Sequence, residues 1–209
     1  MTGRFADEKA DFNPRSWLSK YRRNSIGYIM KMLLFYHGIG VILLLIGSYI
    51  IQQAIPDYKE PEIPRSLIGV IAAGPMEETI FFGIPFYVVG STFFVLVTGL
   101  LWAGTHLLNT NSLSINALAF GNLLFVLPSL FFSLRTWASG KGWFSIIVHS
   151  AWNAIFFTAG CMTGEFTCTA IDKDVNSTLI SILLSAGLLG GTYFLYKRNE
   201  AKKRQRLAI

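Results

Sequence analysis

Charged residues are scarce in this chain. They make up 14% of its 209 residues, whereas hydrophobic residues make up 52%, and the mean hydropathy is +0.47. This composition excludes an ordinary soluble domain, in which about 25% of the residues are charged. The sequence also lacks a glycine-rich phosphate loop, an internal repeat and any low-complexity segment beyond a basic tail. These absences argue against a phosphate-loop enzyme and against a repeat protein.

Long apolar runs occupy most of the sequence instead. Runs of about 18–25 apolar residues are typical of transmembrane helices, and helices are the only open-ended elements that can cross lipid. The first run starts too late and is too long for a cleavable signal peptide. The predicted fold class is therefore all-α, a polytopic membrane helix bundle with about six transmembrane helices. The expected spans are 25–52, 66–89, 92–108, 114–134, 143–161 and 177–196.

The excess of positive charge lies at the two ends of the apolar region. The segment KYRR precedes the first span and KRNEAKKRQR follows the last. Lysine and arginine beside apolar spans fix orientation and contact anionic lipid headgroups, so we assign the net charge of +6 to membrane lipids and not to nucleic acid. We expect a polar cytoplasmic arm (1–24), one six-span domain (25–197) and a basic cytoplasmic tail (198–209) in a multi-pass protein.

Two loops carry more acidic than basic residues, and we place both outside the membrane. They are residues 53–65 and 162–176. Loop charge also places Arg135 and Lys141 in an inner turn. The two cysteines, Cys161 and Cys168, both fall at the second acidic loop. They can form an extracytoplasmic disulfide or stay reduced, and their spacing does not decide between these states.

Two adjacent acids, Glu77 and Glu78, interrupt the second apolar run. An ionised, unpaired pair in mid-membrane would cost roughly 5–7 kcal/mol, so the pair must be placed in a polar cavity, paired or protonated. Neighbouring helical residues point about 100° apart. We therefore expect one glutamate to face a cavity and the other to find a partner on an adjacent helix.

Two further spans carry polar residues that can converge on this pair. His106 follows Trp102 by four residues, and His149 precedes Asn153 by four, so each pair shares one helix face. Ser145 lies one turn before His149 on that face. These groups can meet the two carboxylates inside one bundle.

A structural role is the alternative for the polar residues taken singly. His106 alone is more often an interhelical hydrogen-bond donor, and His37 in the first span fits the same role. Asn153 alone most often holds helices together, and Trp102 is most simply a packing residue. The adjacent acids differ from these residues because packing has no need for two of them.

Together the polar groups supply the parts needed to hydrolyse an amide bond. A carboxylate can act as a general base towards water, with an imidazole positioning that water. A second imidazole and a carboxamide can donate hydrogen bonds to the oxyanion that develops. Alternatively, Glu77, His106 and His149 can hold a divalent metal such as zinc that activates the water. The residue types are compatible with both routes, and no serine forms a convincing triad with an aspartate.

Three motifs in this order resemble the CPBP family of intramembrane proteases, which includes the CAAX prenyl proteases and the bacteriocin-processing Abi proteins. The motifs are EETIFFG from Glu77, WAGTH ending at His106, and SIIVHSAWN with His149 and Asn153. Two positions depart from the family pattern: Phe82 stands in place of the first motif's arginine, and Trp102 in place of the usual phenylalanine.

The resemblance implies a role for each motif residue. Glu77 would be the base that activates water, His106 would share that water, and Glu78 would be a supporting acid. His149 and Asn153 would stabilise the oxyanion. The resemblance favours a glutamate-dependent reaction without metal and leaves zinc open. The implied substrate is a peptide or membrane-protein segment, and prenylated peptides are one candidate.

Two other functions stay open. A proton- or cation-coupled transporter can use a buried glutamate pair as a relay, although such relays usually place ionisable groups at several depths along one path. A catalytically inactive family member that binds a membrane partner is the second, and Phe82 in place of arginine is its best support.

Overall fold

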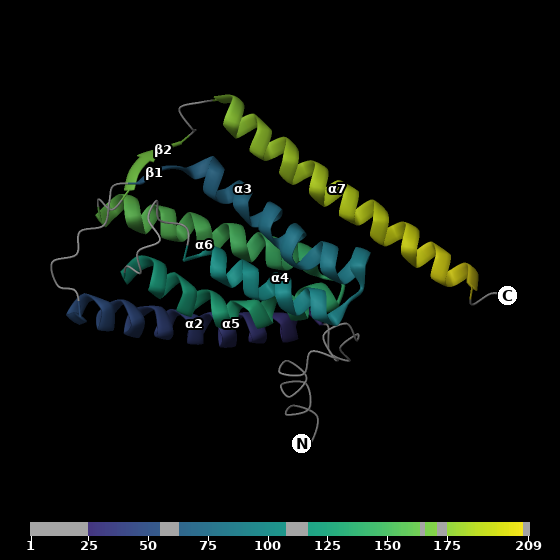
Figure 1. The fold of residues 1–209 in the computed structure, drawn as a ribbon, viewed down its shortest axis with the longest axis horizontal. Helices are drawn as coiled ribbons and strands as arrows, with labels where there is room; N and C mark the ends of the chain where they lie inside the picture. Colours follow the sequence, from purple (N-terminus) through teal and green to yellow (C-terminus); the bar gives the residue numbers. More distant parts are fainter. Residues whose placement is uncertain (1–24, 55–62, 108–116, 164–165, 171–174, 207–209) are drawn as a thin grey trace, which may run out of the picture.

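The computed structural model describes residues 25–54, 63–107, 117–163, 166–170 and 175–206 (Figure 1). The predicted arm 1–24 lies outside these residues. The helices are α2 (Ile26–Ala54), α3 (Leu67–Glu78), α4 (Thr92–Thr105), α5 (Ala117–Ala138), α6 (Gly142–Thr163) and α7 (Val175–Arg206). Two π-helical segments, η2 (Thr79–Gly83) and η3 (Pro85–Val89), continue α3, and two short strands are β1 (Ile63–Ser66) and β2 (Phe166–Thr169).

Four helical segments among the described residues are long and apolar enough to cross a membrane. They are Ile26–Ala54, Leu67–Val89, Gly142–Met162 and Thr178–Arg198. The apolar segment Phe93–Thr105 of α4 is shorter. The prediction of an all-α membrane helix bundle is confirmed, and each of the six expected spans coincides with one helix from α2 to α7, with η2 and η3 extending α3.

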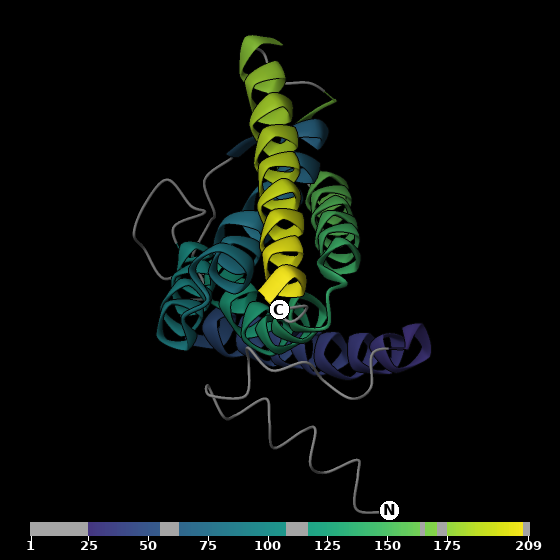
Figure 2. The same ribbon diagram turned by 90° about the vertical axis from the view of Figure 1, so that its right-hand side faces the viewer.

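The helices pack as neighbours in the order α2, α5, α6, α3 and α7. Helix α2 lies along α5, and α3 lies along α6, while α7 crosses the outer side of α3 (Figures 1 and 2). Helix α4 packs against α5 and η2. The largest buried cluster combines residues of η2, α4 and α5, namely Phe82, Val95, Trp102, Ala103, Phe125, Val126, Leu130, Leu134 and Trp137.

Glycines allow two of these helix pairs to approach closely. A Cβ atom on Gly40 of α2 would lie 2.8 Å from the carbonyl oxygen of Phe125 in α5. A Cβ atom on Gly74 of α3 would lie 2.9 Å from the backbone nitrogen of Ser150 in α6. Small residues let membrane helices pack backbone to backbone, because lipid provides no hydrophobic drive for their association.

The strand pair has no counterpart in the sequence-based prediction. β1 and β2 pair in parallel, with Ile63 opposite Phe166 and Ser66 opposite Thr169. They lie within the two acidic loops assigned to one side of the membrane, and both strands are found at the same end of the bundle (Figure 1). A disulfide joins Cys161 at the end of α6 to Cys168 in β2. Of the two states left open for the cysteines, the structure shows the bridge.

Helix α5 continues past residue 134, where the fourth span was expected to end. Helix α5 extends through Ala138, so Arg135 lies in its last turn and is only 3% exposed. Its guanidinium donates a hydrogen bond to the hydroxyl of Tyr28 and lies 5.6 Å from the centre of that ring. In a loop the guanidinium would be hydrated, whereas here it interacts with the hydroxyl and the ring face of Tyr28. Helix α7 runs to Arg206, so the first part of the basic tail expected at 198–209 is helical.

Candidate active site between helices α3, α4, α5 and α6

The two glutamates lie where α3 passes into its π-helical continuation. Pro75, two residues before Glu77, has no backbone N–H and leaves the carbonyl of Ile71 without its usual helical partner. The hydroxyl of Ser150 on α6 donates a hydrogen bond to this carbonyl at 3.1 Å. Two π-helical segments follow directly, and π-helical turns occur frequently at functional sites. The irregular backbone of α3 is thus supported by α6 at the level of the acids.

Glu78 is directed into the bundle and is fully paired. Glu78 is only 1% exposed. One carboxylate oxygen, Oε1, accepts a hydrogen bond from Ser133 at 2.8 Å, and Oε2 accepts one from the indole nitrogen of Trp137 at 2.7 Å. The hydroxyls of Ser133 and Ser145 are 2.9 Å apart. Two donors from α5 therefore hold this carboxylate in a fixed orientation.

Glu77 points to a different environment. Its side chain is 26% exposed and lines a cavity, and its Oε2 accepts a hydrogen bond from the indole nitrogen of Trp102 at 2.9 Å. Phe82 packs edge-on against Trp102, with ring centres 5.2 Å apart. The two acids thus occupy the different environments expected from their angular separation on the helix.

His106 is oriented by its own helix. Its Nδ1 lies 2.9 Å from the carbonyl oxygen of Trp102. A carbonyl only accepts hydrogen bonds, so Nδ1 carries the proton and Nε2 of the neutral ring carries the lone pair. This arrangement presents an unprotonated ring nitrogen as a base or a metal ligand.

His149 lies between the two carboxylates. Its Nδ1 is 3.4 Å from Oε1 of Glu78, and its Nε2 is 3.6 Å from Oε2 of Glu77. A proton on either nitrogen therefore has a carboxylate oxygen nearby, and a fully protonated ring would be attracted to both acids. His149 connects the buried acid to the acid in the cavity.

Asn153 lines the same cavity one turn further along α6, and its side-chain nitrogen donates a hydrogen bond to the carbonyl of Val70 in α3 at 2.9 Å. This bond joins two helices, which is the structural role considered for Asn153 in the sequence. A carboxamide nitrogen has two N–H groups, so the bond to Val70 uses one of them.

A cavity of about 380 Å³ brings together all five residues proposed from the sequence. Glu77, Glu78, His106, His149 and Asn153 all line it. Aromatic and aliphatic side chains form much of the remaining wall, and several polar residues join them. The further residues relevant to the site are His37, Trp102, Phe125, Ser129, Phe132, Ser133, Ser145, Trp152 and Phe156.

Among the described residues, one group of three side chains has the spacing that a metal ion requires. The donor atoms of Glu77, His106 and His149 all lie within 4.8 Å of one another. Carboxylate and imidazole are ordinary zinc ligands, and three protein ligands with one open position are typical of a catalytic zinc site. The donor set therefore fits a divalent metal as well as a water molecule.

Sequence reasoning missed the contribution of the fourth span. Ser133 and Trp137 hold Glu78, yet only the second, third and fifth spans were expected to contribute to the site. A usable signal is the spacing of Ser129, Ser133 and Trp137, which places three polar groups on one face of an apolar helix. His37 was interpreted only as an interhelical hydrogen-bond donor. It lines the cavity, and its ring stacks on that of Trp152 with the ring centres 5.7 Å apart.

Comparison with known proteins gives one family. Residues 59–155 match the Rce1-like family, which is described as type II CAAX prenyl endopeptidase Rce1-like. The matched range contains all five of the residues proposed from the sequence. Searches of the curated proteins and of the solved structures found no match to the chain.

Proposed function

Because residues 59–155 belong to the Rce1-like group of the CPBP family of CAAX-type intramembrane proteases, we propose that this integral membrane protein hydrolyses a peptide bond inside its cavity. The observation that carries the proposal is the placement of Glu77. It is an acid that faces the cavity, is oriented by a hydrogen bond, and lies beside two imidazoles. This is the arrangement that activation of a water molecule requires.

Glu77 acts as the general base in this proposal. The N–H of Trp102 occupies one side of Oε2 and fixes the carboxylate plane, so the carboxylate can accept a proton from a water in the cavity. That water attacks the carbonyl carbon of the substrate peptide bond. The proton held by Glu77 then passes to the nitrogen of the leaving amine, so the acid returns to its carboxylate form.

His106 positions the attacking water. Its Nδ1–H is engaged by the carbonyl of Trp102, which leaves the lone pair of Nε2 to accept a hydrogen bond from the same water. A water held between a carboxylate and an imidazole has a defined position and orientation before the substrate arrives. Such positioning contributes to the rate because little reorganisation is needed at the moment of attack.

His149 and Asn153 stabilise the negative charge that develops on the carbonyl oxygen. Glu78 lies beside Nδ1 of His149, so it favours a proton there and balances the charge of a protonated ring. The ring can then donate from Nε2 towards the cavity. The second N–H of Asn153 adds another donor. Glu78 is a positioning residue in this account, because Ser133 and Trp137 already occupy its oxygens.

A divalent metal is compatible with the same residues. Glu77, His106 and His149 would hold it, and the hydrogen bond from His106 to the carbonyl of Trp102 is the kind of support that orients a metal-binding histidine. When bound, the metal would supply Lewis-acid activation of water.

Phe82 does not by itself favour an inactive protein. It is fully buried behind Trp102 and is not part of the cavity wall, so its side chain supports the indole that orients Glu77. A transporter would need a path from the cavity to both sides of the membrane. Among the described residues, one end of the cavity, beside Glu78, is closed by buried side chains that include Phe132 and Ser145.

Peptide cleavage in lipid nanodiscs tests the proposal. Wild type, Glu77→Gln and the control Glu200→Gln, which removes an acid near the end of α7, would be incubated with a panel of apolar membrane peptides and analysed by mass spectrometry. We expect wild type and Glu200→Gln to cut, and Glu77→Gln to be slower by about 10²–10⁴-fold. Equal cleavage by wild type and Glu77→Gln, or no cleavage of any peptide by wild type, would contradict it. Loss of activity with a chelator and its recovery with zinc would identify the metal route.

A further inference from the structure

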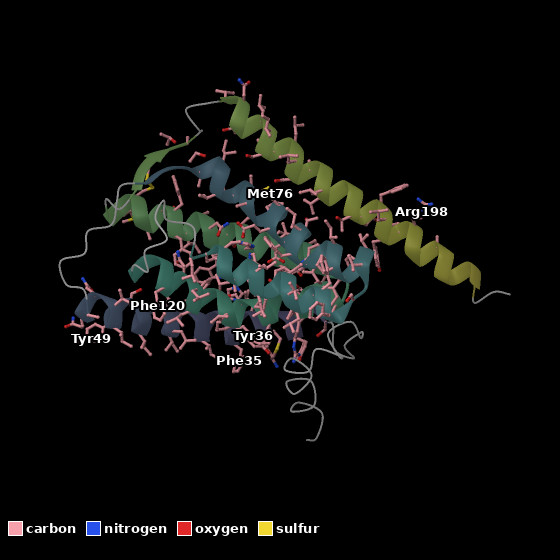
Figure 3. All side chains as sticks on the ribbon, viewed as in Figure 1. Phe35, Tyr36, Tyr49, Met76, Phe120 and Arg198 are labelled. Carbon is pink, nitrogen blue, oxygen red and sulfur yellow. A yellow bond between two sulfur atoms is a disulfide. The ribbon has the colours of Figure 1, made fainter. Side chains whose placement is uncertain are left out.

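Among the described residues, the cavity extends from the glutamates towards one end of the bundle. Its most distant lining residues include Ser48, Asn122 and Gly160. These lie near the end of α2, the start of α5 and the end of α6, respectively. All three helix ends are on the side that carries the β1–β2 pair and the disulfide (Figure 1). In Figure 3, Tyr49 lies at this end of the molecule and Arg198 at the opposite end.

The exposure of the lining residues differs between the two ends of the cavity. At the inner end, Phe132, Ser133 and Ser145 are at most 3% exposed. At the disulfide end, Gly160 is buried, but Ser48 and Asn122 are half-buried and Ala159 is exposed. Within the part of the chain that the structure describes, the cavity is therefore closed on the far side of Glu78 and accessible towards the disulfide.

Two independent features indicate which side of the membrane this end faces. A disulfide between Cys161 and Cys168 is stable in an oxidising, extracytoplasmic compartment. The opposite end of the bundle carries Lys141 after α5 and the basic run that begins at Lys197 in α7. Basic residues at the ends of membrane spans mark the cytoplasmic side. Both features place the disulfide end outside.

We propose that the active-site cavity opens to the extracytoplasmic side and accepts an apolar peptide segment from that half of the membrane. The inference rests on the proposed function for the reaction itself. Its substrate class is a membrane protein or membrane-inserted peptide whose scissile bond lies on the extracytoplasmic side of the bilayer centre. Phe125, Trp152 and Phe156 line the cavity on the way to Glu77, so apolar side chains beside the scissile bond fit this path. The carboxyl-terminal tail of a substrate in the cytoplasm would instead meet the end of the bundle at which the cavity is closed.

Cysteine accessibility tests this inference without depending on cleavage. The native cysteines form a disulfide, so a single introduced thiol can be followed with a membrane-impermeant maleimide. Ser48→Cys and Asn122→Cys place a thiol in the open part of the cavity, and Ser139→Cys places one just after α5 at the opposite end. Each variant would be labelled in right-side-out and in inside-out membrane vesicles.

We expect Ser48→Cys and Asn122→Cys to label in right-side-out vesicles and Ser139→Cys to label in inside-out vesicles. Labelling of both cavity variants only in inside-out vesicles would overturn the proposal, as would a complete failure of both to label from either side. The bulky label at Ser48→Cys should also block peptide cleavage by the purified protein. If wild type cleaves no peptide while the labelling pattern is as expected, the proposed reaction fails and the sidedness stands.

Discussion

Glu77 and Glu78 are adjacent in the chain, but their side chains meet different helices. Glu78 is held by Ser133 and Trp137 of α5, and each of its carboxylate oxygens accepts a hydrogen bond. Glu77 receives one hydrogen bond, from Trp102 of α4, and keeps part of its surface in the cavity. This difference in partners is the reason for proposing a positioning role for Glu78 and a chemical role for Glu77, although both are the same residue type.

Replacing Trp102 by phenylalanine tests the role of its N–H. The change keeps an aromatic ring beside Phe82 and removes the hydrogen bond to Glu77. A hydrogen bond to a charged group contributes about 1.5–3 kcal/mol, so we expect kcat to fall about ten- to a hundredfold with little change in KM. Steady-state peptide cleavage measures the effect. Trp143→Phe, at the exposed start of α6, is the matched control and should retain wild-type kcat. An unchanged kcat in Trp102→Phe would show that the bond does not support catalysis.

At the scale of single residues, the sequence predicts which polar residues meet in the cavity better than it predicts which partners hold them. Acids and histidines inside apolar spans are costly, so their presence in such a span is itself a sign of a functional site. The partners are serine and tryptophan, which occur in membrane helices for many reasons. The sequence favours a packing role for Trp102, because nothing in its helix shows that its N–H meets an acid from α3.

Helix α3 is the element that brings the acids to the site. Gly74 allows its backbone to approach α6, and Pro75 frees a carbonyl that Ser150 of α6 then satisfies. Asn153 of α6 and Ser185 of α7 donate to the neighbouring carbonyls of α3, at 2.9 Å and 3.1 Å. Helix α3 is therefore fixed from two sides just before it presents Glu77 to the cavity.

A methyl group at Gly74 should disturb this arrangement. In Gly74→Ala the new Cβ would lie 2.9 Å from the nitrogen and 3.1 Å from the Cα of Ser150, so α3 and α6 must separate. We expect a loss of about 1–3 kcal/mol in stability and a fall in kcat of about tenfold to a hundredfold as Glu77 moves from His149. Gly187→Ala on α7, where the added Cβ meets nothing within 4 Å, is the control and should leave cleavage unchanged. Wild-type kcat in Gly74→Ala would contradict the account of α3.

The helices themselves follow from hydropathy, whereas their irregular parts do not. The length of an apolar run identifies a membrane span, because in lipid the backbone groups can form hydrogen bonds only within their own helix. The π-helical turns after Glu78 pack against α4, α5 and α7, and these contacts have no local signal in the sequence. The extension of α5 through Arg135 depends on Tyr28 of another helix. The β1–β2 pair joins segments about a hundred residues apart and has no local signal in the sequence.

The molecule as a whole has two chemically distinct ends. One end carries the strand pair and the disulfide, and the other carries basic residues. The disulfide ties the end of α6 to β2, which pairs with the strand leading directly into α3. The helices that supply Glu77 and His149 are thus connected outside their membrane-spanning parts.

Reduction of the disulfide should weaken this connection. The bridge closes a short loop with a sequence separation of 7 residues, for which chain entropy gives about 2–3 kcal/mol of stabilisation. We expect dithiothreitol to lower the Tm of the wild-type protein in detergent. The double variant Cys161→Ser/Cys168→Ser should melt like reduced wild type and should not respond to the reductant. A wild-type Tm that does not change on reduction would show that the bridge contributes nothing to stability.

The central claim is that Glu77 and His106 act on one water molecule, and a double-mutant cycle of peptide cleavage tests it most directly. Glu77→Gln and His106→Ala would each be compared with wild type and with the double variant under single-turnover conditions. Groups that act as a unit have strongly non-additive effects. The account predicts that each single change slows cleavage by about 10²–10⁴-fold and that the double variant is no more than about tenfold slower than the slower single variant. Single effects that multiply in the double variant would contradict it.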